Sequence, residues 1–330
     1  MLDNAVYKDP ILSDPEFCKD IENGLNSNPK HLPCKYFYDK SGSELFDQIC
    51  QTPEYYVTRT ETELLTQILP EIAEMVLPGC DILEFGSGAG HKIRLLLDAL
   101  YQPSSYTPMD ISESALMESA SKLRRDYPQI DIRPWVGDYT VDLTENLKNL
   151  SHSSQRVVFF PGSTISNFTP EEARAFLVRI SAWLGENGVL LIGVDTVKSE
   201  SILNAAYNDA QGVTAAFNLN LIHRIRNELD IAIDPQDFKH HAFFNSSESR
   251  IEMHLVALRE HSILIGGRPV HFEQGESIHT EDSYKYSQES FSALAESAGL
   301  EIGKSWLDDD NLFSFHFLRN NSNARLNPEV

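Results

Sequence analysis

The sequence predicts an α/β fold in which helices cover both faces of a parallel sheet. Three observations predict it. Strand-like and helix-like segments alternate between residues 61 and 198, the strand-like segments are short and apolar while the helical ones are amphipathic, and a glycine-rich turn joins the first strand to the next helix. Parallel strands need helical crossovers and are buried on both faces, so this alternation is typical of such a sheet.

The alternating segments can be assigned in order along the chain. A helix is expected over residues 61–76, with Thr60 or Thr62 as its cap and Pro70 as a kink, and Pro78-Gly79 ends it. Strands and helices then follow in turn until residue 195. The expected strands cover residues 80–85, 104–110, 130–139, 156–162 and 188–195, and the expected helices cover residues 91–100, 113–127, 141–150 and 169–184.

The rhythm changes after Asp195. Residues 199–285 hold a long helical region, 201–230, followed by two strand-like runs. These runs cover residues 250–260 and 262–266. The α/β pattern then resumes between residues 288 and 320 with a helix, a strand-like segment and an alternating last strand. A helix followed by two strands that a polar turn joins suits an antiparallel hairpin at the edge of the sheet.

This order divides the chain into four parts. The core of the parallel sheet is expected at residues 61–198, and residues 286–330 complete it with a helix and the edge hairpin. Residues 1–60 and the insertion at 199–285 are expected to form a second α/β lobe. We expect this lobe over the carboxyl ends of the strands, where open α/β sheets bind ligands.

The composition excludes several classes of partner. The chain has 27 basic and 49 acidic residues, a formal net charge of −22, and such a surface repels phosphate backbones and anionic lipid. The acidic, proline-punctuated N-terminus is unlike a signal peptide, and no apolar run approaches the ~20 residues that cross a bilayer. The four cysteines lie far apart without metal-ligand spacing. We therefore expect a cytoplasmic protein with no nucleic-acid, membrane or metal partner.

The sharpest local signal is the turn after the first strand. Glu84 ends this strand, and Gly86, Gly88 and Gly90 follow in a G-x-G-x-G turn that opens a helix. His91 stands where a nicotinamide-binding fingerprint requires glycine, and the G-K-[ST] of a P-loop is missing. The turn instead resembles the first motif of the S-adenosylmethionine-dependent methyltransferases, although a purely structural strand-to-helix turn would have the same pattern.

Polar residues also end the second and third strands. Asp110 stands about where doubly wound folds place the acceptor for ribose hydroxyls. Asp138 is placed to accept from an adenine amine, with Tyr139 beside it for stacking. Each acid by itself is more often a helix cap or a solvated loop residue. Acids at the ends of three consecutive strands favour a nucleoside-containing cofactor.

Longer segments carry a fuller resemblance, and they include the second lobe. They cover residues 35–61, 84–100, 159–173, 193–220, 249–257 and 278–287. In these segments the chain closely resembles the ergothioneine-pathway L-histidine Nα-methyltransferases. The resemblance implies a Rossmann-like class I methyltransferase sheet with an inserted second α/β lobe. It also implies a monomer that uses S-adenosyl-L-methionine, released as S-adenosyl-L-homocysteine, and acts on the small molecule L-histidine.

The resemblance also implies roles for individual residues. The cofactor would be held by Gly86, Lys92, Asp110, Asp138 and Tyr139, together with Glu84 and Gly88 of the first motif. The carboxylate and amine of the amino acid would be held by Tyr56, Asn167 and Tyr207. The imidazole would be read by Glu281 and Ser283, with Met253 packed nearby. The nitrogen that is methylated would be surrounded by Phe46, Tyr38 and the backbone of Gly162. Asp282, between the two imidazole readers, departs from the family pattern.

These residues suit three successive methyl transfers that convert histidine to hercynine, the first step of ergothioneine biosynthesis. The protein aligns nitrogen, methyl and sulfur, and an amine with a pKa of roughly 8 needs no strong base, so Tyr38 is the candidate for orienting it or passing its proton on. N-methylation of tryptophan or another aromatic amino acid is the alternative, which Glu281 and Met253 disfavour. A catalytically inactive cofactor-binding module is a more distant one.

Overall fold

The computed structural model describes residues 7–8, 14–88, 90–141 and 155–321. The chain forms two compact units, each of them discontinuous in sequence. Unit 1 takes residues 57–197 and 285–330 with the N-terminal ten, and unit 2 takes residues 11–56 and 198–284. The chain passes from unit 1 to unit 2 between residues 197 and 198 and returns between residues 284 and 285. Each boundary lies one residue before the expected one. Tyr7–Lys8 (β1) pairs in the sheet of unit 1, which corrects the placement of the whole of residues 1–60 in the second lobe.

Unit 1 is built on one mixed sheet with the order β1-β6-β4-β3-β7-β8-β15-β14, and β5 pairs beside β4. Its strands are β3 (Asp81–Phe85), β4 (Ser105–Asp110), β5 (Asp131–Ile132), β6 (Trp135–Val136), β7 (Arg156–Phe160), β8 (Val189–Asp195), β14 (Leu300–Leu307) and β15 (Phe313–Asn320). All pairs from β1 to β8 are parallel, whereas β15 runs antiparallel to β8 and to β14. This confirms a doubly wound sheet with an antiparallel edge hairpin.

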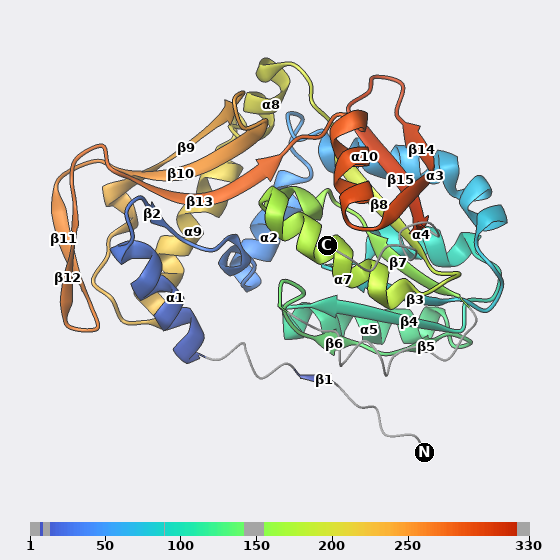
Figure 1. Ribbon diagram of the computed structural model, residues 1–330. Helices are drawn as coiled ribbons and strands as arrows, with labels where there is room; N and C mark the ends of the chain where they lie inside the picture. Colours follow the sequence, from blue (N-terminus) through green and yellow to red (C-terminus); the bar gives the residue numbers. More distant parts are fainter. Residues whose placement is uncertain (1–6, 9–13, 89, 142–154, 322–330) are drawn as a thin grey trace, which may run out of the picture. The chain divides into compact units, whose positions relative to one another are not determined.

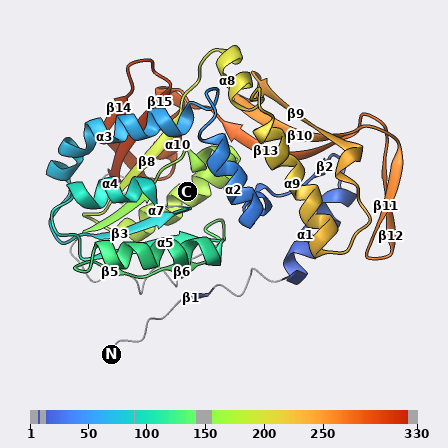
Figure 2. The same cartoon turned by 180° about the vertical axis from the view of Figure 1, so that it is seen from behind.

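Helices cover both faces of this sheet. Figure 1 and Figure 2 show α7 (Pro170–Leu184) and α10 (Gln288–Ser297) on one face. The other face carries α3 (Val57–Met75), α4 (His91–Ala99) and α5 (Glu113–Asp126). Strands β3 and β8 are buried at every position, as expected for strands covered on both sides.

Three local expectations for unit 1 change. Helix α3 begins at Val57, so Thr60 and Thr62 lie inside it and neither is its cap, and Pro70 stays within the helix. The single strand expected over residues 130–139 is two short strands, because Pro134 between them has no N–H to donate to a ladder. The helix expected over residues 141–150 lies outside the described residues, apart from its first residue.

A buried ion pair joins the places where the chain leaves and re-enters unit 1. Asp195 Oδ2, at the end of β8, lies 2.7 Å from Lys285 Nζ, and the two side chains are 0% and 1% exposed. Thr196 and Tyr286 form a parallel bridge next to the pair, and Tyr286 N donates to the Asp195 carbonyl over 3.1 Å. The outgoing and returning segments therefore run side by side within unit 1.

Unit 2 contains a four-stranded sheet with the order β2-β13-β10-β9. Its strands are β2 (Lys30–His31), β9 (Phe238–Asn245), β10 (Arg250–Ala257) and β13 (Ser277–Tyr284), and β11 (His261–Ile265) forms a separate hairpin with β12 (Arg268–Phe272). Its helices are α1 (Asp14–Asn26), α2 (Lys40–Ile49), α8 (Glu200–Ala206) and α9 (Val213–Glu228), with 3₁₀ turns η1 (Cys34–Phe37) and η3 (Pro235–Asp237). Strands β9, β12 and β13 were absent from our element assignment.

Two irregularities of unit 2, a break between α8 and α9 and a register shift between β10 and β13, decide where side chains of these elements point. The helical region expected over residues 201–230 breaks between α8 and α9, where the Asp209 carboxylate accepts from the backbone N–H of Val213 and Thr214. The ladder between β10 and β13 shifts register between Met253 and His254. The shift leaves one residue of β13 without a ladder partner. On the far side of this residue, the side chains of β13 project from the opposite face to the one that strict alternation predicts.

Candidate active site

The glycine loop is joined to the end of strand β4. Gly86 and Ser87 both donate their N–H to the carbonyl of Met109, over 2.8 and 3.2 Å, and Gly88 N donates to Asp110 Oδ2 over 3.0 Å. Gly86 and Gly88 have φ angles of 68° and 48°, a region that favours glycine. The structure thus brings Gly86, Gly88 and Asp110 together at the carboxyl ends of two adjacent strands.

The loop leaves room and polar groups for a ligand. A Cβ on Gly88 would meet nothing within 4 Å, and one on Gly86 would lie 3.7 Å from Tyr139 Cε1. Ser87 Oγ is buried and has no hydrogen-bond partner among the described residues. An open loop surface with an unsatisfied buried hydroxyl fits a polar cofactor that lies against the backbone.

Two further cofactor candidates, Asp138 and Tyr139, lie at the same edge of the sheet as Asp110. The Asp110 carboxylate also accepts from Ser112 N over 2.9 Å, and burial raises its pKa. Gly137 N donates to the Asp110 carbonyl over 3.0 Å, which brings the end of β6 beside the end of β4. Asp138 is buried there and accepts from Thr140 N, over 2.8 Å. Tyr139 completes an aromatic wall with Phe85, Phe160, Phe168 and Phe176, at ring centroid distances of 6.0–6.4 Å.

Glu84 differs from the other candidates because its side chain is 2% exposed and accepts a hydrogen bond from the Tyr106 hydroxyl. Burial raises the pKa of Glu84 to about 8. The side chain therefore holds its proton to a higher pH than an ordinary glutamate does. The hydrogen bond from Tyr106 holds the Glu84 side chain in place just before the glycine loop. Any contact of Glu84 with the cofactor stays a prediction.

Glu61 is a central residue that the sequence reasoning missed. It is fully buried on α3, accepts from Gly162 N over 2.6 Å and forms an ion pair with Lys92. A Cβ on Gly193 would lie 2.7 Å from Glu61 Oε1, so glycine at this point of β8 makes room for the carboxylate. Glu61 thereby ties the cofactor candidate Lys92 to the substrate candidate Gly162.

The remaining substrate candidate of unit 1 is Asn167. It ends a 3₁₀ turn, η2 (Thr164–Asn167), just before α7. Thr169 caps α7 in a reciprocal capping box with Glu172, so the helix does not need Asn167 as its cap. Gly162, with φ of 80°, precedes the same turn.

Unit 2 gathers the other substrate candidates around an aromatic cluster. Ring centroids lie 5.8 Å apart for Tyr38 and Phe46, 6.2 Å for Phe46 and Tyr55, and 6.2 Å for Tyr55 and Tyr207. Phe217 of α9 packs against Tyr38 and Phe46 at 5.8 and 6.1 Å. Tyr55 and Phe217 were not among the candidates, yet they join Tyr38, Phe46 and Tyr207 into one cluster.

Polar groups of strand β13 lie beside this cluster. The Tyr207 hydroxyl donates to Ser283 Oγ over 2.8 Å, and both residues are buried. Glu281, two residues earlier, pairs with Met253 of β10 in the ladder. Burial raises the pKa of Tyr55 well above its ordinary value, and the neighbouring Tyr207 and the Glu281 carboxylate add to this rise. The structure therefore brings Tyr207, Met253, Glu281 and Ser283 together.

Tyr56 has a partner that sequence reasoning also missed. Lys198 Nζ donates to the Tyr56 hydroxyl over 2.6 Å and lies 4.5 Å from the centroid of its ring. Tyr56 is 7% exposed, so its hydroxyl is held in one place by a cation rather than free in solvent. Of the substrate candidates, Gly162 and Asn167 belong to unit 1 and all the others belong to unit 2.

A family model described as "Histidine-specific methyltransferase, SAM-dependent" matches residues 17–320 of the chain. The chain belongs to this family. The assignment agrees with the doubly wound sheet and its glycine loop, and it identifies the molecule as a methyltransferase that depends on S-adenosylmethionine. It also agrees with the resemblance seen in the sequence.

Named relatives of this methyltransferase cover most of its length. The histidine N-alpha-methyltransferases of Mycobacterium tuberculosis and Mycolicibacterium smegmatis are 38% and 39% identical to it over 296 residues, 88% of this chain and 91% and 90% of theirs. Ergothioneine biosynthesis protein 1 of Neurospora crassa is 29% identical over 309 residues, which are 88% of this chain and 33% of that protein.

The structure adds one observation about membranes. Among the described residues of the methyltransferase, no helix combines the length and the apolar character that crossing a bilayer requires. Among the described helices, the longest of unit 1, α3, carries charged residues along its length, and the longest of unit 2, α9, carries them near its C-terminal end, at Arg224, Arg226 and Glu228.

Proposed function

We propose that this methyltransferase transfers three methyl groups from S-adenosylmethionine to the α-amino nitrogen of L-histidine and so forms hercynine, the first step of ergothioneine biosynthesis. One observation carries the choice of substrate within the family. Glu281 and Ser283 lie two residues apart on β13 beside Met253, and Tyr207 holds Ser283 through a hydrogen bond of 2.8 Å. A carboxylate and a hydroxyl in this arrangement match the two nitrogens of an imidazole better than an indole.

The residues of unit 1 fit the cofactor, which supplies an electrophilic methyl group and leaves as S-adenosylhomocysteine. Asp110 would accept from the ribose hydroxyls, Asp138 from the adenine amine, and Tyr139 would pack against the ring. Gly86 and Gly88 would let it lie close against the backbone of the loop, and Lys92, held by Glu61, would supply a positive charge.

The residues around the substrate divide into three groups in this proposal. Glu281 accepts from one imidazole N–H and Ser283 pairs with the other nitrogen. Tyr56, Asn167 and Tyr207 hold the carboxylate and the amine. Tyr38 and the Gly162 backbone orient the amine that is methylated, and a partly neutral amine makes a strong base unnecessary.

Phe46 would hold the amine as it becomes a quaternary ammonium, which has no N–H left to donate. A cation against an aromatic face gains roughly 0.5–2 kcal/mol, so Phe46→Ala is expected to slow the last transfer by roughly 2–30-fold and to leave mono- and dimethylhistidine. Mass spectrometry of the product mixture over time measures this. Phe243→Ala, on strand β9 of unit 2 and outside the aromatic cluster of Phe46, is the matched control. An unchanged trimethyl fraction in Phe46→Ala contradicts the role.

The function itself is tested with the purified chain, S-adenosylmethionine and an equal mixture of the twenty amino acids. Mass spectrometry is expected to show histidine alone gaining one, two and then three methyl groups. Methylation of tryptophan or another amino acid contradicts the substrate. Cofactor binding without any methylation contradicts the activity and favours the inactive module.

We also propose the setting of the reaction. Unit 2 serves as the substrate lobe, the chain works as a cytoplasmic monomer, and neither nucleic acid nor a membrane is a partner. The net charge of −22 supports the last point, since it opposes binding to polyanionic surfaces.

A further inference from the structure

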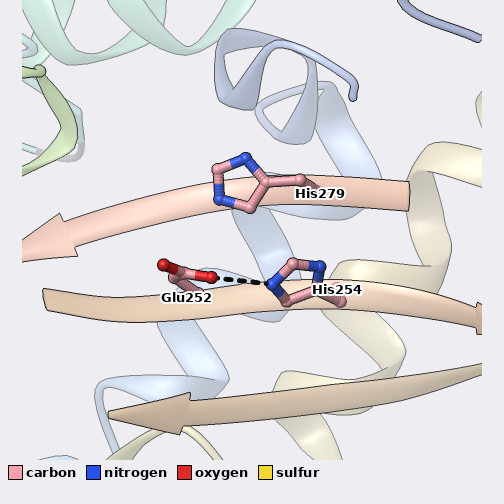
Figure 3. A group of neighbouring side chains, drawn as sticks. All are labelled: Glu252, His254 and His279. Carbon is pink, nitrogen blue, oxygen red and sulfur yellow. Dashed lines mark hydrogen bonds and ion pairs between the residues drawn. The ribbon is translucent and has the colours of Figure 1, made fainter. Parts of the chain in front are cut away.

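Three potential metal ligands meet on the four-stranded sheet of unit 2. Glu252 and His254 are alternate residues of β10, so their side chains project from the same face. His279 of β13 is the direct ladder partner of His254. One ligand atom from each of the three residues lies within 4.8 Å of the others. Figure 3 shows the three side chains turned toward one another across the two strands.

This group is separate from the imidazole-reading residues. Met253 pairs with Glu281 in the ladder, while the neighbouring pair is Glu252 with Asp282. Neighbouring pairs point to opposite faces of a sheet, so Glu252 and Glu281 project in opposite directions. Thr280, at the register shift, donates to Asn218 of α9 on the covered face. The three-residue group is therefore on the face away from α9.

Surrounding residues orient the Glu252 carboxylate. Its Oε1 accepts from Asn245 Nδ2 over 2.9 Å and forms an ion pair of 2.8 Å with Arg250. Its other oxygen, Oε2, points to His254 Nε2 at 3.1 Å. One carboxylate oxygen is thus committed to neighbours that hold the group in place, and the other faces the two imidazoles. This is the support that an outer shell gives to metal ligands.

The two imidazoles are positioned in the same manner. The Phe243 ring stacks on His254 with centroids 5.6 Å apart and planes 13° from parallel. Asp282 Oδ1 lies 2.9 Å from His279 Nε2, and a carboxylate next to a ligating imidazole commonly orients it. His254 and His279 are 15% and 27% exposed, so both rings are held yet reachable by an ion from solvent.

The donor set selects the kind of ion. Two imidazoles and one carboxylate are ligands of Zn²⁺ and other divalent transition metals, with a position left open, whereas Mg²⁺ and Ca²⁺ prefer oxygen ligands only. With neutral imidazoles, the carboxylates of Glu252 and Asp282 and the guanidinium of Arg250 sum to one negative charge. A divalent cation would therefore meet a net favourable charge.

We propose that Glu252, His254 and His279 bind one divalent transition-metal ion, with Zn²⁺ as the ion that fits the donor set best. The cysteine spacing had led us to expect no metal in this chain. The proposed ligands come instead from two strands whose pairing no local motif reveals. The proposal is independent of methyl transfer, and it stands whichever amino acid the enzyme methylates.

The test uses the untagged full-length chain, freed of metal with a chelator and then dialysed. Titration with Zn²⁺ by calorimetry, and with Co²⁺ by visible absorption, is expected to show one tight equivalent. His254→Gln and His279→Gln are each expected to weaken that equivalent by about 100-fold, since each removes one of three ligands. His271→Gln changes a histidine of the β11–β12 hairpin and serves as the matched control.

Two results would overturn the proposal. One is the absence of a stoichiometric equivalent for Zn²⁺ and Co²⁺ in the parent chain. The other is an equivalent that persists with unchanged affinity in both histidine variants, because the ion would then lie elsewhere. Circular dichroism checks that each variant folds. Should a histidine variant fail to fold, Glu252→Gln, which keeps the acceptor for Asn245 and Arg250, gives the same comparison.

Discussion

Replacing Glu281 with alanine is expected to raise the KM for histidine by roughly 10–150-fold and to leave the dissociation constant for S-adenosylmethionine unchanged. A hydrogen bond to a charged group contributes about 1.5–3 kcal/mol, and the variant loses the acceptor proposed for an imidazole N–H. Discrimination against phenylalanine should fall as well, because a site built to pair polar groups rejects analogues that lack them. Initial rates with histidine and phenylalanine at saturating cofactor, together with calorimetry, measure the three quantities.

The neighbouring Asp282 offers a matched control for this experiment. It is also a carboxylate, but it forms an ion pair of 3.1 Å with Arg250 and a contact of 2.9 Å with His279, on the opposite face of the sheet. Asp282→Ala is therefore expected to change the KM for histidine little. Equal effects of the two variants, or an unchanged preference for histidine in Glu281→Ala, would refute the assignment of Glu281.

Lys285→Met is expected to lower the free energy of unfolding by about 3–5 kcal/mol, the usual cost when one partner of a buried ion pair is removed. Asp195 is left as a buried carboxylate, since the pair is fully enclosed at 2.7 Å. Urea unfolding followed by circular dichroism measures the change.

Two further variants separate the ion pair from simple loss of a lysine. The double variant Asp195→Asn/Lys285→Met is expected to recover part of the stability, because no charge is then stranded in the interior. Lys304→Met removes a half-exposed lysine that pairs with Glu71 on the surface of unit 1, and the expected cost is small because solvent screens the pair. A Lys285→Met variant as stable as Lys304→Met would show that the buried pair contributes little.

The sheet of unit 1 was predictable because strands that are buried on both faces have a continuous apolar sequence, as in β8. Unit 2 gives a weaker pattern. Strand β9 carries Lys239 and His241 on its exposed face and His240 on the opposite face, where its ring lies 2.9 Å from Asn218 of α9, and so it has neither an apolar run nor clean alternation. Its register with β10, and with it the group of Glu252, His254 and His279, could not be derived from local sequence.

The same distinction applies to the candidate site. The glycine loop and Asp110 follow from strand ends that the sequence marks, whereas Lys198 meets Tyr56 across 142 positions and Glu61 meets Gly162 across 101. Such contacts depend on how the elements pack. For Glu61 one signal existed, since a glutamate stands in line with the buried Leu64, Leu65 and Ile68 on the core face of α3.

The side-by-side segments at Asp195–Val197 and Lys285–Tyr286 have a consequence for how this architecture can change over evolutionary time. Because the chain leaves and returns at neighbouring points, residues 198–284 behave like a cassette whose two ends meet on the parent scaffold. An insertion with adjacent ends leaves the order β7-β8-β15 of the scaffold intact. Residues 198–284 can therefore change in length, in structure or in the amine that they recognise, while the strands that carry the glycine loop keep their places.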